Sequence, residues 1–202
     1  MDGFNLYHAI ADLGINHLKW VDLWKLMEHF HDPTHHEIVS INYFSAYATW
    51  LPDAQKRHRK YVAALRAVGV TPVMARFKQK DRHCAKCKSR WIAHEEKESD
   101  VNIALRIISD AYQDKYDRAH IVTGDSDLVP AVKNLKSNFP KKQIRVILPP
   151  KRICYDLAQA AGKKSVNTIL PFHLERSLLP QKVLDSNGRL AAMRPPEYSP
   201  PR

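Results

Sequence analysis

Two aspartates, one residue apart, follow a short apolar segment in the middle of the chain. The segment "AHIVT", residues 119–123, is typical of a strand, and Asp125 and Asp127 come directly after it. Carboxylates at such a position suit Mg²⁺ or Mn²⁺, which proteins hold through a few oxygen ligands, water and substrate phosphate. A simpler interpretation is equally open, because Asp127 is a suitable N-cap for a helix that begins at Leu128.

Two other segments carry carboxylates of the same kind. Asp2 lies in "MDGFN", where Gly3 suits a turn and Asn5 opens a helix, so this aspartate resembles one that ends a strand. Asp100 lies in the first turn of an expected helix, residues 100–114, where the helix dipole favours a negative charge. A metal site becomes more plausible than a set of helix caps only if these segments meet.

Strand and helix patterns alternate along the rest of the chain. Strands are expected at residues 36–48, 70–77, 119–123, 143–148 and 166–170. Helices are expected at residues 6–30 with a break at 14–16, and then at 53–69, 100–114 (capped by Ser99), 128–139 and 153–162. This order predicts an α/β fold with a mostly parallel sheet covered by helices, in which ligands bind at the carboxyl ends of the strands. The three acidic segments are therefore expected at one rim.

Three motifs carry a resemblance to a known family. The segments "DGFNLY", "EEKESDVNIAL" and "TGDSDLVPAV", in this order and with a terminal "HLERSLLP", resemble the NYN domain family, PIN-like relatives of nucleases that include LabA-like bacterial proteins. The resemblance spans nearly the whole chain. It implies a Rossmann-like PIN fold and a metal-dependent ribonuclease site. In that site the metal-binding carboxylates would be Asp2, Asp100 and Asp125, and Asp127 would be a further acidic member. Asn5 and Ser126 would position the metal or the phosphate.

The start of the chain departs from the pattern of the family. NYN domains carry an apolar strand immediately before the "DGxN" motif, in the centre of the sheet, and here only Met1 precedes Asp2. Three buried Val or Ile side chains in such a strand would contribute roughly 5–9 kcal/mol, comparable with the stability of a whole domain. We therefore expect the first strand of the domain to lie upstream of Asp2. The domain itself is expected to span residues 1–178, with an extension at 179–202 that ends in a Pro-rich tail.

The composition favours a polyanionic partner. The chain has 32 Lys and Arg against 21 Asp and Glu, a net charge of +11. RNA is the partner that the resemblance implies, although each basic cluster alone is equally typical of a solvated surface. No signal peptide or membrane segment is recognisable and there are three cysteines, so we expect a cytoplasmic protein without disulfides. A homodimer is compatible with the family.

The segment "DRHCAKCKSRWIAHEEK", residues 81–97, leaves two interpretations open. Cys84 and Cys87 form a C-x-x-C, and with His83 or His94 they would make a small structural zinc site; reduced thiols on a basic hairpin are the alternative. The segment and the residues before it also suit a flap that binds a phosphate backbone and stacks an aromatic ring on a base. The expected contacts are Lys78, Lys80, Arg82, Lys86, Lys88, Arg90 and Trp91.

The leading functional hypothesis is a metal-dependent endoribonuclease, a hydrolase that uses Mg²⁺ or Mn²⁺ at the Asp cluster to cleave RNA phosphodiester bonds. Two alternatives stay open. One is a non-catalytic RNA-binding or regulatory domain that keeps the fold. The other is an enzyme that acts on a small heteroaromatic substrate in the same pocket, because one fold supports many functions.

Overall fold

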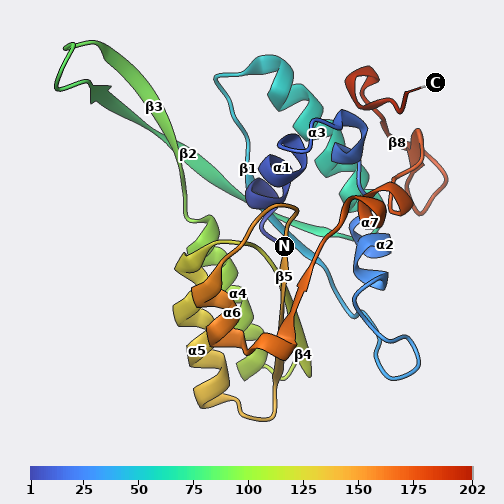
Figure 1. Cartoon of the computed structure of the whole chain (residues 1–202). Helices are drawn as coiled ribbons and strands as arrows, with labels where there is room; N and C mark the ends of the chain where they lie inside the picture. Colours follow the sequence, from blue (N-terminus) through green and yellow to red (C-terminus); the bar gives the residue numbers. More distant parts are fainter. Residues whose placement is uncertain (202) are drawn as a thin grey trace.

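The computed structural model describes residues 1–201, which form an α/β fold built on two half-sheets of three strands each (Figure 1). The first half-sheet contains β1 (Asn42–Ala46), β2 (Thr71–His83) and β3 (Arg90–Lys97), and the second contains β4 (Arg118–Val122), β5 (Gln143–Leu148) and β6 (Val166–Thr168). The β1–β2, β4–β5 and β5–β6 pairs are parallel, whereas β2 and β3 are antiparallel. The expected mixed α/β fold with parallel strands and flanking helices is therefore confirmed.

Met1 and Asp2 join the two half-sheets. The amide of Phe44 in β1 donates to the carbonyl of Met1 at 2.9 Å, and the amide of Asp2 donates to the carbonyl of Val122 in β4 at 3.0 Å. Asp2 pairs in parallel with Phe44 of β1. Met1 and Asp2 therefore occupy the position of the carboxyl end of a central strand. The half-sheets are thus held in register where the acidic segments of the sequence meet.

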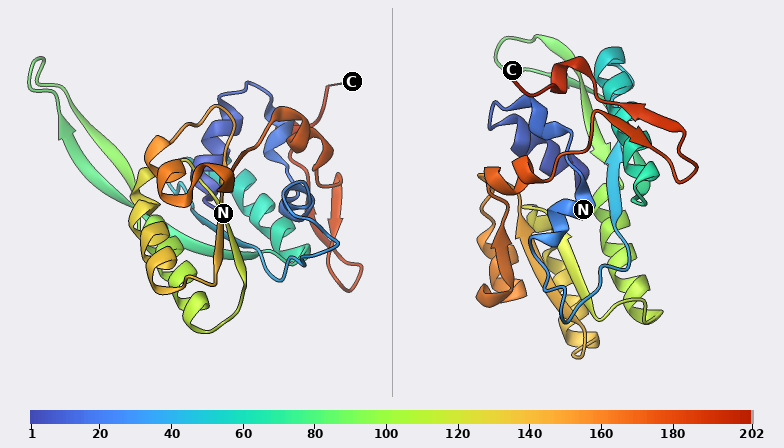
Figure 2. Two further views of the ribbon diagram at one scale, coloured as in Figure 1. Left: turned by 60° about the horizontal axis from the view of Figure 1, so that its bottom comes forward. Right: turned by 90° about the vertical axis from the view of Figure 1, so that its right-hand side faces the viewer.

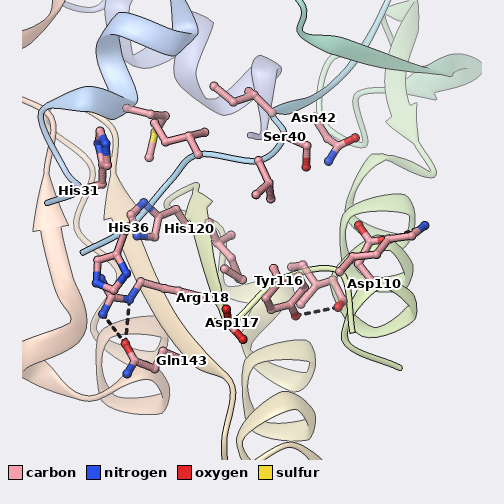
Figure 3. A pocket seen from close by; sticks show the side chains of 18 of the residues that line it. His31, His36, Ser40, Asn42, Asp110, Tyr116, Asp117, Arg118, His120 and Gln143 are labelled. Carbon is pink, nitrogen blue, oxygen red and sulfur yellow. Dashed lines mark hydrogen bonds and ion pairs between the residues drawn. The ribbon is translucent and has the colours of Figure 1, made fainter. Parts of the chain in front are cut away.

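Next to Met1 the two half-sheets separate around a cavity of about 520 Å³. Residues 36–42 line one side of it, and residues 118–121 of β4 line the other (Figure 3). The strand expected at residues 36–48 is confirmed only for 42–46. Within residues 1–201, no strand lies between residues 36–41 and β4, so that edge of the backbone has no partner in the sheet.

Helices cover both faces of the sheet (Figure 2). The helices α1 (Gly3–Ala11), α2 (Leu23–Glu28), α3 (Pro52–Ala67) and α7 (Pro171–Arg176) enclose one apolar cluster, which includes Leu6, Leu26 and Leu65. The helices α4 (Ser99–Tyr112), α5 (Val129–Asn138) and α6 (Tyr155–Ala161) enclose a second cluster around β4 and β5. Short 3-10 turns η1 (Asn16–Lys19), η2 (Ser126–Leu128) and η3 (Lys163–Ser165) connect these elements.

The β2–β3 hairpin extends far from the body of the molecule (Figures 1 and 2). Its register runs from Arg76 opposite Lys97 to His83 opposite Arg90. The expected strand at 70–77 is therefore longer, because the segment beyond residue 77 gains an antiparallel partner in β3 that no local pattern reveals. Cys84 and Cys87 lie at the tip of this hairpin, and the 81–97 segment also includes β3 and the end of β2.

Residues beyond 178 pack on the same core. The strands β7 (Lys182–Leu184) and β8 (Leu190–Met193) form a small antiparallel sheet, followed by the 3-10 turn η4 (Pro196–Tyr198). Val183, Ala192 and Tyr198 are buried in the first apolar cluster. The segment expected as an extension with a tail is thus folded against α3 in the described residues. Among residues 1–201, each helix is too short or too polar to cross a membrane.

Candidate active site

Asp2 is a buried carboxylate held at the point where the half-sheets meet. Its side chain is only 6% exposed and caps α1, where Oδ1 accepts a hydrogen bond from the Asn5 amide at 2.9 Å. Its Oδ2 accepts a hydrogen bond from the hydroxyl of Thr123 at 2.9 Å. Burial raises the pKa of Asp2, an effect opposed by these two hydrogen bonds and increased by the nearby charge of Asp125. Asp2 is therefore fixed in orientation and destabilised as an anion.

The loop after β4 is tied to the same point. Thr123 is fully buried, and its hydroxyl accepts a hydrogen bond from the Asp125 amide at 3.1 Å. The Asn5 side-chain oxygen accepts from the Gly124 amide at 3.0 Å. A Cβ at Gly124 would lie 2.9 Å from Cβ of Arg152, which explains a glycine at this position of "TGDSD". Asn5, expected to position metal or phosphate, here positions the loop that carries Asp125.

Asp125, and not Asp127, is the cap in this loop. Asp125 precedes η2, and its Oδ1 accepts a hydrogen bond from the Asp127 amide at 2.9 Å. The helix α5 begins at Val129 with no side-chain cap. The interpretation of Asp127 as an N-cap is therefore wrong, because the 3-10 turn moves the cap two residues earlier. Asp127 and Ser126 are exposed to solvent.

Asp100 brings the third acidic segment to the same place. It lies in the first turn of α4, as expected. Partial burial and the charges of Asp125, Asp2 and Asp127, in that order, raise the pKa of Asp100 to about 6. Because carboxylates influence one another in this way only over short distances, the four aspartates form one acidic cluster.

Glu96 is a further carboxylate at this cluster that the sequence analysis missed. Burial raises its pKa, with smaller contributions from the charges of Asp2 and Asp100. Ser99 was expected to cap α4; instead Glu98 occupies that position with φ +80°, and the Ser99 hydroxyl donates to Glu96. This tight turn between β3 and α4 is what places Glu96 beside Asp100. The sequence "EEKESD" gives only the weak signal of an acid four residues before Asp100.

The donor set fits a hard divalent cation in its chemistry. Aspartate and glutamate oxygens from two loops and a helix terminus are the ligands that Mg²⁺ and Mn²⁺ prefer. Within residues 1–201, no group of three or more His, Cys, Asp or Glu side chains is placed so that it could hold a metal ion. The cluster therefore offers oxygens of a suitable kind, but as they stand its carboxylates do not converge on one metal position, and water and substrate phosphate would have to supply further ligands.

Comparison with known proteins decides the family. The sequence profile described as NYN domain matches residues 1–166, most of the chain. The chain belongs to the NYN domain family. The acidic cluster lies within the matched region of this NYN domain.

Two individual proteins are similar over most of their length. The sequence is 26% identical over 239 residues to 6-hydroxy-3-succinoylpyridine 3-monooxygenase HspA from Pseudomonas putida (strain DSM 28022 / S16), an alignment that covers 100% of this chain and 70% of the relative. The fold is similar to the crystal structure of VPA0982, a protein of unknown function from Vibrio parahaemolyticus RIMD 2210633. The TM-score is 0.59 at 22% identity, and 88% of this chain and 91% of the other are covered.

The basic residues of the hairpin in this NYN domain are divided between its two faces. Residues opposite each other in an antiparallel pair share a face, and neighbours along a strand alternate. Phe77 and Glu96 are opposite each other, so Lys78, Lys80 and Arg82 lie on the other face with Trp91. There Lys80, Arg82 and Lys97 form ion pairs with Glu95. Lys86 and Lys88 lie at the tip, and Arg90 begins β3 on the face of Glu96.

The two hairpin cysteines have no third ligand in the described residues. The Cys87 amide donates to Sγ of Cys84 at 3.5 Å, and Sγ of Cys87 lies 3.1 Å from the Ser89 hydroxyl. Hydrogen bonds from Ser89 and from Cys84 lower the pKa of the Cys87 thiol to about 7. Both thiols are free, and zinc binding by them stays a prediction.

Proposed function

We propose that this NYN domain is a metal-dependent ribonuclease that hydrolyses RNA phosphodiester bonds at the acidic cluster. The observation that carries the proposal is the convergence of Asp2, Asp100 and Asp125, three segments far apart in the sequence, on one rim of the sheet. The match to the NYN family and the net charge of +11 support the same activity. Asp2 and Asp125 also cap helical turns, but capping alone does not require the charges to be close enough to add to the effect of burial in raising the pKa of Asp2 and Asp100.

In this proposal Asp2, Asp100 and Asp125 hold one or two Mg²⁺ or Mn²⁺ ions. A bound divalent ion polarises a phosphoryl oxygen and lowers the pKa of a bound water. The chain's own residues provide orientation: Thr123 and the Asn5 amide fix the Asp2 carboxylate, and the Asn5 side chain fixes the Gly124–Asp125 loop. Asp127 and Glu96 add negative charge that strengthens cation binding, and the exposed Ser126 hydroxyl is free to donate to a phosphate oxygen.

Hydrolysis needs one water for each bond. The water oxygen forms a bond to phosphorus, one P–O ester bond breaks, and the two protons of the water end on the leaving oxygen and in solvent.

The test is cleavage of end-labelled RNA by the purified chain with Mn²⁺, with Mg²⁺ and with EDTA. Loss of an outer-shell partner of a metal typically costs about 10–100-fold, so replacement of a ligand in Asp125→Asn or Asp100→Asn should cost at least as much. Asp117→Asn is the matched control. Asp117 lies at the opposite end of β4 from Asp125, and its side chain is fully exposed. Wild-type cleavage by Asp125→Asn, or cleavage in EDTA, would refute the proposal. RNA binding without cleavage would favour the non-catalytic alternative.

A second candidate function follows from the relative HspA. Its printed name describes oxygenation of a hydroxylated pyridine, and the alignment covers the whole of this chain. We propose hydroxylation of a small heteroaromatic ring as the competing activity. Incubation with 6-hydroxy-3-succinoylpyridine, O₂ and a reduced nicotinamide tests it directly. Because C3 already carries the succinoyl group, mass spectrometry should look for a dihydroxypyridine formed with loss of that group as well as for a product heavier by one oxygen atom.

A further inference from the structure

A continuous row of aromatic rings lies beside the acidic cluster. Phe4 and His8 of α1 are 4.3 Å apart between ring centroids, and Phe4 is 5.7 Å from Phe77 of β2. Phe77 is 4.7 Å from Trp50, whose ring stacks on that of His94 at 3.6 Å with 10° between the planes. We call this set the aromatic row; it consists of His8, Phe4, Phe77, Trp50 and His94.

The row starts at the acidic cluster and leads away from it. Phe4 lies two residues after Asp2, in the first turn of the helix that Asp2 caps. Phe77 is the cross-strand partner of Glu96, so its ring shares a face of the hairpin with that carboxylate. His94 is opposite Gln79, two positions further along on the same face. The rings of the aromatic row therefore follow the base of the hairpin, where β2 and β3 leave the body beside α1 and α4 (Figure 1).

These rings are neither core residues nor isolated surface residues. Phe4 is 37% exposed and His8 is exposed, whereas Phe77, Trp50 and His94 are partly buried. The edge-to-face contacts hold each ring in place at little further entropic cost. A preformed row of partly exposed rings from α1, β2, β3 and the turn before α3 is a feature of surfaces that stack planar groups.

We infer that the aromatic row binds the unpaired bases of single-stranded RNA next to the phosphodiester bond that the acidic cluster attacks. This inference rests on the proposed function and assigns its substrate class. Bases within a duplex are stacked on each other, so only unpaired bases can lie on protein rings. The ribose-phosphate backbone would then leave the acidic cluster along the base of the hairpin.

The surrounding charges are consistent with this path. Arg152 lies over Gly124 beside the acidic cluster, and its guanidinium also pairs with Asp12 at 2.7 Å. Arg90 lies on the same face of the hairpin as Phe77, further toward the tip. On the opposite face Lys80, Arg82 and Lys97 are paired with Glu95. We assign Arg152, beside the acidic cluster, and Arg90, toward the tip, as the cations that bind the backbone on this path.

Binding is measured by fluorescence anisotropy with a labelled ten-nucleotide RNA, in the Asp125→Asn background with Mg²⁺ so that turnover does not interfere. Phe77→Leu and Trp50→Leu keep apolar volume and remove the ring. Each should weaken binding about 5- to 100-fold, the usual effect of losing one base–aromatic stack. Phe77→Tyr and Trp50→Phe restore a ring and should bind as the parent does. Tyr112→Leu is the control, because Tyr112 is an exposed aromatic at the far end of α4. Thermal denaturation verifies that each variant folds.

RNA structure supplies the second arm of the test. A duplex of the same sequence should bind more weakly and should not respond to Phe77→Leu. An RNA that lacks one base should bind the parent protein as weakly as the complete RNA binds Phe77→Leu. The same abasic RNA should bind Phe77→Leu no more weakly than the complete RNA does. Equal binding of duplex and single strand, or a loss in Trp91→Leu as large as in Phe77→Leu, would overturn the inference, because RNA would then use shape or the opposite face. A pyridine compound that binds at the row while RNA does not would overturn it in favour of a small ligand.

The two proposals fail in different ways. If Asp125→Asn abolishes cleavage while ring variants bind and cleave normally, the ribonuclease stands and the aromatic row is not its substrate surface. If ring variants lose RNA binding while no condition gives cleavage, the row binds RNA and the catalytic proposal fails.

Discussion

Asp100 is the residue whose environment reports most directly on the acidic cluster. Its pKa is raised to about 6 by partial burial and by the charges of Asp125, Asp2 and Asp127. A raised pKa means that the ionised form is less stable in the folded chain than in the unfolded chain. At neutral pH the fold therefore carries an electrostatic cost at this residue, which a bound cation would remove.

We predict that Asp100→Asn stabilises the metal-free protein at pH 7.5. The neutral amide removes the repulsion, and after allowance for solvent screening the gain is about 1 kcal/mol, or about 2–4 °C in Tm. Differential scanning fluorimetry with EDTA measures it, with Asp117→Asn as the control that should not change Tm. The same variant should lose most of the Tm increase that Mn²⁺ gives the wild type. A lower Tm for Asp100→Asn in EDTA would contradict this account.

The same residue predicts the pH dependence of metal binding. Below the raised pKa of about 6 a proton occupies Asp100, and cations must displace it, so the affinity for Mn²⁺ should fall as pH decreases from 7.5 to 5.5. Without metal, the stability of the fold should change in the opposite direction and increase as pH falls toward 5, because the unfavourable ionised form of Asp100 is then lost. Isothermal titration calorimetry across this range gives the affinities. Asp100→Asn should bind more weakly, with a shallower dependence on pH.

At the scale of elements, Gly3 sets the distance between α1 and β1. A Cβ at Gly3 would lie 2.3 Å from Cε2 of the buried Tyr43 ring. The helix α1 therefore approaches β1 more closely than any side chain at this position allows. That approach holds Asp2 against Thr123 and β4.

The effect of Gly3→Ala on the free energy of unfolding shows whether helix propensity or packing dominates at this position, because the two contributions have opposite signs. Alanine in place of glycine within a helix favours folding by roughly 0.5–1 kcal/mol, whereas overpacking costs about 1–3 kcal/mol. We predict that overpacking dominates, so urea denaturation should show a net loss of about 1–2 kcal/mol. Because Tyr43→Leu makes room, Gly3→Ala should cost less in that background, a coupling that a double-mutant cycle measures. Additive effects of the two substitutions would show that Tyr43 is not the cause.

The sequence predicts regular elements better than their pairing. The periodicity of residues 100–114 and the apolar run at 119–123 give α4 and β4 within one or two residues, because both signals are local. The extension of β2 to His83 depends on its pairing with β3, and the alternation of that pair separates Lys78 from Phe77. The cap at Asp125 depends on a 3-10 turn of three residues. Asp2, Asp100 and Asp125 were named from the sequence, whereas Glu96 and the aromatic row require the hairpin register.

At the scale of the whole molecule, the sheet is continuous only through Met1 and Asp2. The cavity beside them separates residues 36–42 from β4, and Ile41 and Ile121 are among the residues that line it. Met1 itself is buried, and its amino group donates to the carbonyl of Asn42 at 2.7 Å. Burial lowers the pKa of this ammonium group to about 6, since no carboxylate other than Asp2 offsets its desolvation.

The cavity lies between the half-sheets, where a central strand would run, and its lining combines apolar side chains such as Ile103 with charged ones such as Arg106 and Asp110. We predict that five residues such as Ile-Val-Val-Phe-Val, added before Met1, stabilise the protein. Their burial contributes about 7–15 kcal/mol, ordering them costs about 5–10 kcal/mol, and the net gain of roughly 2–5 kcal/mol should raise Tm by about 5–15 °C. Differential scanning calorimetry measures the gain, and an extension of the same length made of Ser, Asn and Gly is the control. If the polar extension raises Tm equally, loss of the buried ammonium charge accounts for the gain. If neither raises Tm, the two half-sheets do not accept a strand between them.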